Sequence, residues 1–183
     1  MNGVRYVIFI FVLMLMPFNS LAQSSKAVET STDILMFLPS AAGGIVSLLE
    51  RDYEGLLQHV ESGAVTVAAT YLLKYTIKKR RPNGEDYHSF PSNHAGIAFV
   101  GAGFLQQRYG WKLGIPAYAV AAYVGWGRVY SKCHDVWDVL AGAAIGTGCA
   151  VLVTSPLARE NKIVLSPIFP KSGTWGVYAA MTF

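Results

Sequence analysis

Three short stretches of this 183-residue sequence carry side chains that could bind and cleave a phosphate ester. The first, residues 74–82, holds five cations within its first eight residues and ends in Arg-Pro. The second, residues 91–94, reads Pro-Ser-Asn-His, and the third, residues 128–138, carries an arginine, a histidine and two aspartates. Phosphate cleavage needs cations and donors to hold the anion, a nucleophile and a proton donor. These stretches contain all of them.

Lys74, Arg81 and Arg128 are the candidate phosphate-binding cations. An arginine offers a planar, permanently charged fork to phosphate oxygens, and a lysine offers a point charge. Lys74 and Arg81 are seven residues apart and share a face if a helix continues that far, so the cations at 78–80 would point elsewhere. Taken alone, the cluster is equally typical of a basic helix end that faces solvent or lipid headgroups.

The second stretch predicts a helix start. Pro91 bends the entry, and Ser92 or Asn93 is a good N-cap. The free backbone N–H groups of a first helical turn bind anions, and His94 would face the same spot. By itself, Ser-Asn-His is also an ordinary helix start.

The third stretch places His134 and Asp138 four residues apart, on one face of an expected helix. A carboxylate beside an imidazole fixes its tautomer and supports the positive charge that the ring acquires on attacking phosphorus. Asp135 would point to another face and act as a cap. Alone, the pair would be a surface contact worth roughly 0.2–0.5 kcal/mol.

The elements that position these residues are expected to be helices of a single all-α domain. Hydrophobic residues make up 52% of the chain and charged residues 14%, against roughly 25% charge in soluble domains. We divide the chain into residues 1–22, a helical domain over 23–155 and an extended tail over 156–183. Within the domain, residues 23–32 are expected to be a loose polar leader. The expected helical segments are 34–49, 62–77, 92–108, 111–129 and 134–154, and the tail is expected to form a short β-hairpin.

Residues 1–22 have a positive start, an apolar run and a Ser-Leu-Ala ending, which predicts a secretory signal peptide or, alternatively, a first membrane helix. Either way the chain is exported. The apolar cores of the later segments are ~12–16 residues, against ~20 for a bilayer span. The sequence is compatible with two alternatives, an integral membrane bundle and an exported helical domain at the membrane surface. Cys133 and Cys149 are expected to be unpaired, His59 and His88 to lie at the surface or in loops, and nucleic acid is not an expected partner.

Taken together, the motifs resemble the type 2 phosphatidic acid phosphatase (PAP2) superfamily, which also contains bacterial acid phosphatases and vanadium haloperoxidases. The resemblance covers about residues 60–155. It implies a bundle of five to six helices, embedded in or associated with the inner membrane, with a site that faces the periplasm. It implies no metal and no cofactor.

The resemblance also implies a role for each motif residue. His134 would be the nucleophile that forms a phosphohistidine, Asp138 would orient it, and His94 would protonate the leaving group. The phosphate would be bound by Lys74, Arg81, Ser92, Asn93 and Arg128. Two positions depart from the family: Asn93 stands where glycine is usual, and Gly127 where serine is usual. We expect altered geometry at the first and a lost hydroxyl donor at the second.

The function expected from this resemblance is metal-independent hydrolysis of phosphate monoesters or pyrophosphates, with a lipid as substrate, at the periplasmic side of the inner membrane. One alternative is a soluble periplasmic acid phosphatase that acts on small esters. A vanadate-dependent haloperoxidase is another. The last is a non-catalytic protein that binds anionic lipid headgroups.

Overall fold

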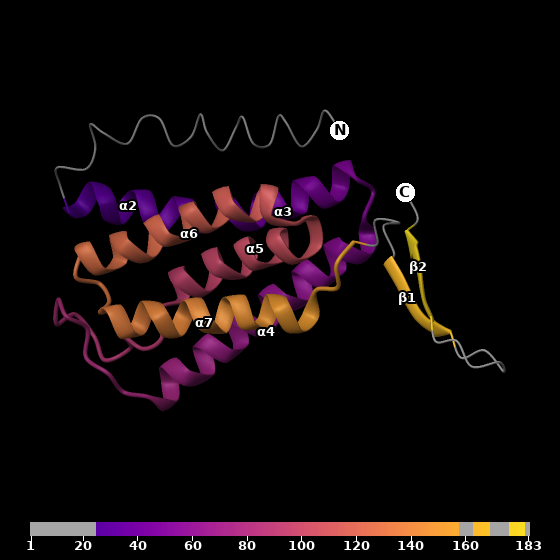
Figure 1. Cartoon of the computed structure of the whole chain (residues 1–183). Helices are drawn as coiled ribbons and strands as arrows, with labels where there is room; N and C mark the ends of the chain where they lie inside the picture. The colour runs from indigo at the N-terminus through magenta and orange to yellow at the C-terminus, as the bar shows by residue number, and fades with distance from the viewer. Residues whose placement is uncertain (1–24, 158–162, 169–175, 182–183) are drawn as a thin grey trace.

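A computed structural model describes residues 25–157, 163–168 and 176–181 (Figure 1). The predicted signal peptide or first membrane helix, residues 1–22, and the predicted hairpin turn lie outside these ranges. Within them the chain is mostly helical, as predicted. The helices are α2 (Ser25–Leu35), α3 (Leu38–Leu49), α4 (Tyr53–Thr76), α5 (Asn93–Tyr109), α6 (Trp111–Tyr130) and α7 (Val136–Val153). The strands are β1 (Ile163–Ile168) and β2 (Gly176–Met181), which pair antiparallel with Ile163 opposite Met181.

Helix α2 occupies most of the stretch that the sequence predicted to be a loose leader, so that prediction was wrong. Its buried residues, Val28, Thr32 and Leu35, are spaced by four and three positions and form one stripe. The stripe packs mainly against α6. A threonine in the middle of the stripe made the segment read as polar.

Helix α4 begins at Tyr53, earlier than the predicted residue 62, because Asp52 caps it by accepting a hydrogen bond from the N–H of Gly55 (2.9 Å). It ends at Thr76, where Ile77 turns to an extended conformation. Arg81 therefore does not continue the helical face of Lys74, contrary to the prediction. Residues 77–92 instead form a loop that leads into α5.

Helix α5 lies at the centre of the bundle and packs against α3, α4, α6 and α7. Its contact with α7 is close because Gly142 and Gly146 have no side chain. A Cβ at Gly142 would clash with the carbonyl oxygen of Ser92, and one at Gly146 with that of Gly96. Backbone therefore lies against backbone, which fixes the start of α7 beside the start of α5.

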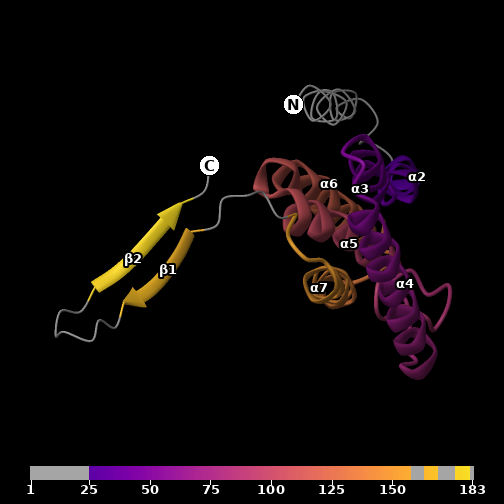
Figure 2. The ribbon, with the colours of Figure 1, turned by 90° about the vertical axis from the view of Figure 1, so that its right-hand side faces the viewer.

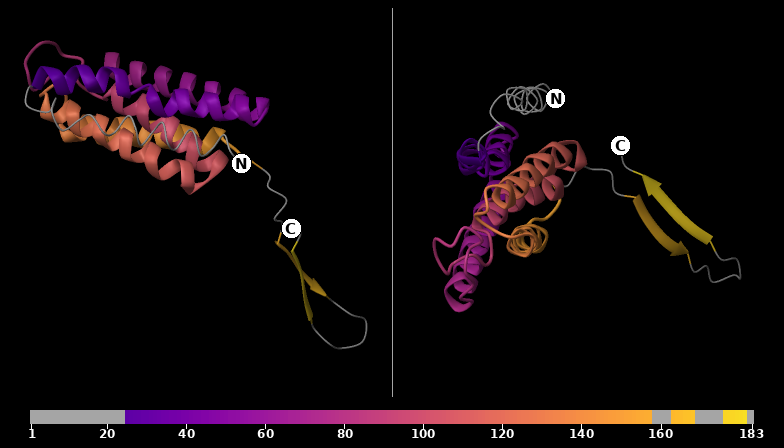
Figure 3. Two further views of the ribbon diagram at one scale, coloured as in Figure 1. Left: turned by 90° about the horizontal axis from the view of Figure 1, so that it is seen from above. Right: turned by 90° about the vertical axis from the view of Figure 1, so that its left-hand side faces the viewer.

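The helix directions bring four helix ends together. In Figure 2 α2 and α7 are seen almost end-on, while α4 runs obliquely past them. The C-terminal ends of α4 and α6 and the N-terminal ends of α5 and α7 lie at the same end of the bundle, as Figures 1 and 3 show. All three sequence motifs are found at this end.

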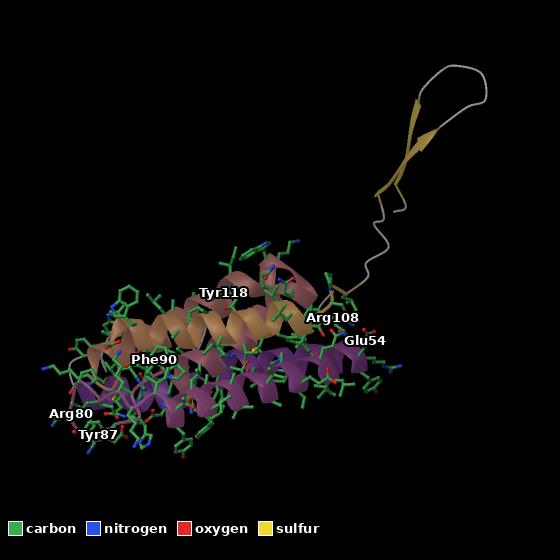
Figure 4. The ribbon with its side chains drawn as sticks, turned by 90° about the horizontal axis from the view of Figure 1, so that it is seen from below. Glu54, Arg80, Tyr87, Phe90, Arg108 and Tyr118 are labelled. Atoms are coloured by element: carbon green, nitrogen blue, oxygen red, sulfur yellow. The ribbon has the colours of Figure 1, made fainter. Side chains whose placement is uncertain are left out.

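The opposite end is closed by a buried ion pair. Arg108 donates to Asp52 through Nε (2.7 Å) and Nη2 (2.6 Å), and Tyr109 donates to the same carboxylate (2.9 Å). Figure 4 shows Arg108 and Glu54 at this end and Arg80 and Tyr87 at the other. The ion pair ties the start of α4 to the end of α5.

Among the described residues, two helical stretches, Ser25–Leu49 and Val136–Val153, are long and apolar enough to cross a membrane by length and composition.

Cys133 and Cys149 are both free, as predicted. His59 is buried and stacks on Phe104 with 4.3 Å between ring centroids, so the surface position expected for it was wrong. Its Nε2 contacts the carbonyl oxygen of Ser40 (3.0 Å).

Candidate active site

Ser92 joins the second and third motifs. Its side chain caps α5 by accepting a hydrogen bond from the N–H of Ala95 (3.4 Å), and its own N–H donates to the carbonyl oxygen of Asp138 (2.9 Å). The first turns of α5 and α7 are thereby held together. Asn93 begins α5, and its Oδ1 is buried without a hydrogen-bond partner.

Lys74 holds the loop that follows α4. Its side chain is largely buried, and Nζ donates to the carbonyl oxygens of His88 (2.8 Å) and Pro91 (3.0 Å). An ammonium group has three donors, so two carbonyls leave one for a ligand. His88 is a loop residue, as predicted, and contributes its backbone.

Arg81 is placed by the loop itself. Its Nε donates to Oδ1 of Asp86 (2.9 Å), and its N–H donates to the carbonyl oxygen of the same residue (2.9 Å). The guanidinium group retains its other N–H donors. The direction of the Arg81 side chain is therefore set by hydrogen bonds within the loop and not by a position on a helix.

Arg128 lies in the last turn of α6, and its side chain is only 4% exposed. Nη1 donates to Asp33 Oδ1 (2.6 Å) and to Thr32 Oγ1 (3.4 Å), while Nε is buried without a partner. The same Asp33 oxygen lies 2.9 Å from Nε2 of His94. Asp33, from α2, thus bridges two predicted site residues and was not predicted as a site residue.

His134 lies in the turn before α7, because Asp135 caps that helix and forms a capping box with Asp138. The expected capping role of Asp135 is confirmed, whereas the expectation that His134 and Asp138 both lie on the helix was wrong. Their side chains still meet. Nδ1 of His134 is 3.6 Å from Oδ2 of Asp138, beyond hydrogen-bonding distance, and has no other partner.

The carboxylate of Asp138 is fully buried and accepts from several donors. These are Lys79 Nζ (2.7 Å), the N–H of Asp135 (3.1 Å) and the hydroxyl of Ser89, which is also fully buried. The sequence predicted that Lys79 would point elsewhere if the helix continued to Arg81; the helix ends at Thr76, and Lys79 lies in the site. Lys79 also contacts Asp135 at 2.5 Å. Although partial burial acts to lower it, the pKa of Lys79 is raised by its hydrogen bonds to these two carboxylates.

All three candidate cations are close enough to His134 to affect its pKa. Burial lowers its pKa from 6.5 to about 3, and the charges of Arg81, Lys74 and Arg128 act in the same direction. Asp138 opposes them. A neutral imidazole among three cations is chemically suited to attack a bound phosphorus, because its lone pair is free and the anion has partners.

In a comparison with known proteins, residues 55–162 match the model of the PAP2 superfamily. The chain belongs to the PAP2 superfamily. It is 34% identical over 169 residues to the lipid A 4'-phosphatase of Helicobacter pylori strain J99, covering 85% of each chain. It is 26% identical over 129 residues to the lipid A 1-phosphatase of H. pylori strain 26695, covering 66% of this chain and 67% of that protein.

Among solved structures, the crystal structure of Aquifex aeolicus LpxE has the same fold. Its TM-score is 0.58 at 19% identity, and the match covers 80% of this chain and 93% of that chain. The predicted PAP2 membership, the helical bundle fold and the enzyme class, a phosphoric ester hydrolase, are confirmed.

The PAP2 departure at Gly127 has a structural reason. A Cβ at this position would clash with Cγ2 of Thr32 and lie 3.1 Å from Cγ1 of Val28, because α2 packs directly over it. The serine that is usual in the family would not fit here without a shift of α2. The hydroxyl of Thr32 lies beside Arg128 instead, so a hydroxyl is still present near this arginine.

Three residues of this PAP2 site were not found by sequence reasoning: Lys79, Ser89 and Asp33. Lys79 stood in the basic cluster but was assigned by helical periodicity, which stops at Thr76. Ser89 had no signal beyond its closeness to residues 91–94. Asp33 lies outside the matched range, between the segment taken for a leader and the first expected helical segment.

Proposed function

We propose that this PAP2 phosphatase hydrolyses a phosphate ester of lipid A without a metal ion, through a phosphohistidine on His134. The observation that carries the catalytic part is the buried His134 beside Asp138; burial and the charges of Arg81, Lys74 and Arg128 lower its pKa, which favours the neutral imidazole. Because Nδ1 faces Asp138, Nε2 is the nitrogen that would attack.

The first chemical step would form a bond between His134 Nε2 and phosphorus and break the bond from phosphorus to the lipid oxygen. His94 would donate a proton to the departing alkoxide, for which it must be protonated in the substrate complex. Burial and the charge of Arg128 lower its pKa to about 4, and the negative charge of a bound phosphate would raise it. The cations would hold the phosphoryl oxygens as charge develops, aided by the backbone N–H groups that begin α5. His134 then carries positive charge, and its Nδ1–H would close the 3.6 Å gap to Asp138, since catalytic hydrogen bonds tighten during reaction.

The second step would hydrolyse the phosphohistidine. His94, now neutral, would take a proton from a water molecule as the oxygen attacks phosphorus. The P–N bond breaks, inorganic phosphate leaves and His134 returns to its neutral form. No electron acceptor and no further reactant are needed.

The lipid part of the proposal is supported by the relatives and by the surface. Both H. pylori proteins are lipid A phosphatases by name, and the 4'-phosphatase is the more similar. Large apolar side chains are exposed along the helices, among them Leu72 (71%) on α4 and Leu152 (87%) on α7. Such a surface favours a lipid environment over a soluble acid phosphatase. We therefore propose that the chain lies in the inner membrane. The export signal predicted over residues 1–22 supports a site at the periplasmic face.

The test is phosphate release by purified protein in detergent with a chelator present. Lipid A, phosphatidate, undecaprenyl pyrophosphate and p-nitrophenyl phosphate would be compared, and the lipid A product examined by mass spectrometry for loss of the 4'-phosphate. We expect preferential release from lipid A and at least a ~10³-fold loss in His134→Ala, a substitution that removes the nucleophile. Preference for the small soluble ester, or a requirement for added divalent metal, would contradict the proposal.

A further inference from the structure

Asp33 forms a bridge that belongs to none of the family motifs. Its Oδ1 accepts from Nη1 of Arg128 at 2.6 Å and lies 2.9 Å from Nε2 of His94, which must carry a proton to face a carboxylate. The two partners are mostly buried, at 4% and 23% side-chain exposure. Asp33 is 50% exposed, so it reaches a buried pair from the surface of the bundle.

A single anionic oxygen between a guanidinium and an imidazole is the contact that a phosphoryl oxygen would make there, if the proposed function holds. Arg128 is not saturated by this contact. Its Nε is buried without a partner, and the Nη1 contact with Thr32 is long at 3.4 Å. The arginine therefore has donor capacity left for a second anion. A half-exposed carboxylate can turn to solvent by a rotamer change.

We propose that Asp33 weakens the binding of phosphate: its carboxylate occupies the position of a phosphoryl oxygen between Arg128 and His94 when no phosphate is bound, and a phosphate ligand displaces it. This inference rests on the phosphate-binding site of the proposed function. In the empty enzyme the carboxylate balances part of the charge of the clustered cations.

The consequence concerns the release of product. Once displaced, Asp33 still lies near the phosphate and repels it, which opposes the binding of inorganic phosphate and of the substrate phosphate alike. A lipid substrate has the further binding energy of its acyl chains, whereas inorganic phosphate has none. The carboxylate therefore keeps product inhibition weak. A unit charge several ångströms from a dianion, at a partly solvated position, changes affinity by about tenfold.

The experiment is a calorimetric titration of the full-length protein in detergent with inorganic phosphate, repeated as product inhibition of lipid A hydrolysis. Asp33→Asn keeps the shape and an acceptor for Arg128 but removes the charge. Glu29→Gln is the matched control, because Glu29 lies one turn earlier on α2 and its carboxylate contacts Sγ of Cys133 (3.3 Å). We expect Asp33→Asn to bind phosphate about tenfold more tightly and Glu29→Gln to change the affinity by less than about twofold.

Equal phosphate affinities for Asp33→Asn and Glu29→Gln would overturn the inference. So would a fall in kcat with unchanged phosphate affinity, since that would make Asp33 a residue that only positions His94. Absence of phosphate binding in both the wild type and Asp33→Asn counts against it as well. The proposed substrate can fail separately: if the protein binds phosphate as expected but does not hydrolyse lipid A, the substrate is wrong and the role of Asp33 stands.

Discussion

Lys79 holds Asp138 through an ion pair of 2.7 Å, although 59 residues separate them in the chain. The carboxylate that faces His134 is therefore also held by a cation at its Oδ1 and by the hydroxyl of Ser89 at its Oδ2, the oxygen that faces Nδ1 of His134. This arrangement fixes the position of Asp138 beside His134. It also explains how a fully buried carboxylate is tolerated beside a histidine that does not hydrogen-bond to it.

Replacement of Lys79 should destabilise the protein. Lys79→Met leaves the buried Asp138 without its charged donor, and since the lysine is 33% exposed, water can replace part of the contact. We expect the free energy of unfolding to fall by about 1–2 kcal/mol, measured by denaturant unfolding in detergent. Lys78→Met, which removes an exposed neighbouring cation, is the control and should change it little. Equal stability of the two variants would show that the ion pair does not stabilise the fold.

Acid sensitivity follows from the lowered pKa of His134. Between pH 6.5 and 3 the unfolded chain binds a proton at this residue that the folded chain does not, so stability is lost as the pH falls through that window. From pH 7 to 5 we expect the wild type to lose about 2 kcal/mol more unfolding free energy than His134→Gln. His88→Gln, at an exposed imidazole, is the matched control. If His134→Gln is as acid-sensitive as the wild type, His134 is not held neutral.

Replacing Gly127 with the serine that is usual in the family should destabilise the protein. Gly127→Ser would push α2 away through Thr32, and overpacking of this kind costs about 1–3 kcal/mol. We expect a lower melting temperature for Gly127→Ser and partial recovery when Thr32→Ser, which removes the clashing methyl group, is added. Thr32→Ser alone measures the cost of that methyl group. A Gly127→Ser variant as stable as the wild type would mean that α2 does not pack here as described.

The proposed orientation predicts which end of the bundle faces outward. Glu85 is exposed in the loop between Arg80 and Tyr87, two residues that Figure 4 labels at the site end, and Glu54 lies at the opposite end. The test variants are Glu85→Cys and Glu54→Cys. In cells with a permeabilised outer membrane, a membrane-impermeant maleimide should label the first and label the second only after lysis. The wild type, with buried Cys133 and half-buried Cys149, gives the background. The reverse pattern would place the site on the cytoplasmic side.

Sequence analysis correctly placed those site residues whose position depends on local backbone rules such as helix capping. Ser92 caps α5 and Asp135 caps α7, as their side chains and positions indicated. Local rules failed for Lys79, because the loop after α4 folds back and pairs Lys79 with His88 in an isolated bridge. The direction of its side chain then depends on tertiary contacts that helical periodicity does not contain.

Helix α2 was missed for a different reason. Its interior stripe includes the polar Thr32, whose hydroxyl is satisfied by the carbonyl oxygen of Glu29 (2.8 Å) within the same helix. A composition-based reading counts such a residue as exposed. The contact of Asp33 with Arg128 joins residues 95 apart in sequence, and no spacing rule in a single sequence predicts such a contact.

The central claim is that His134 becomes phosphorylated during turnover. The most direct measurement is to mix enzyme with lipid A, quench in alkali, where phosphohistidine survives, and search the peptides by mass spectrometry. We predict phosphate on the peptide that contains His134, lost on acid treatment and absent from His134→Ala. Lipid A turnover with no phosphorylated peptide, or with phosphate on a different residue, would contradict the mechanism.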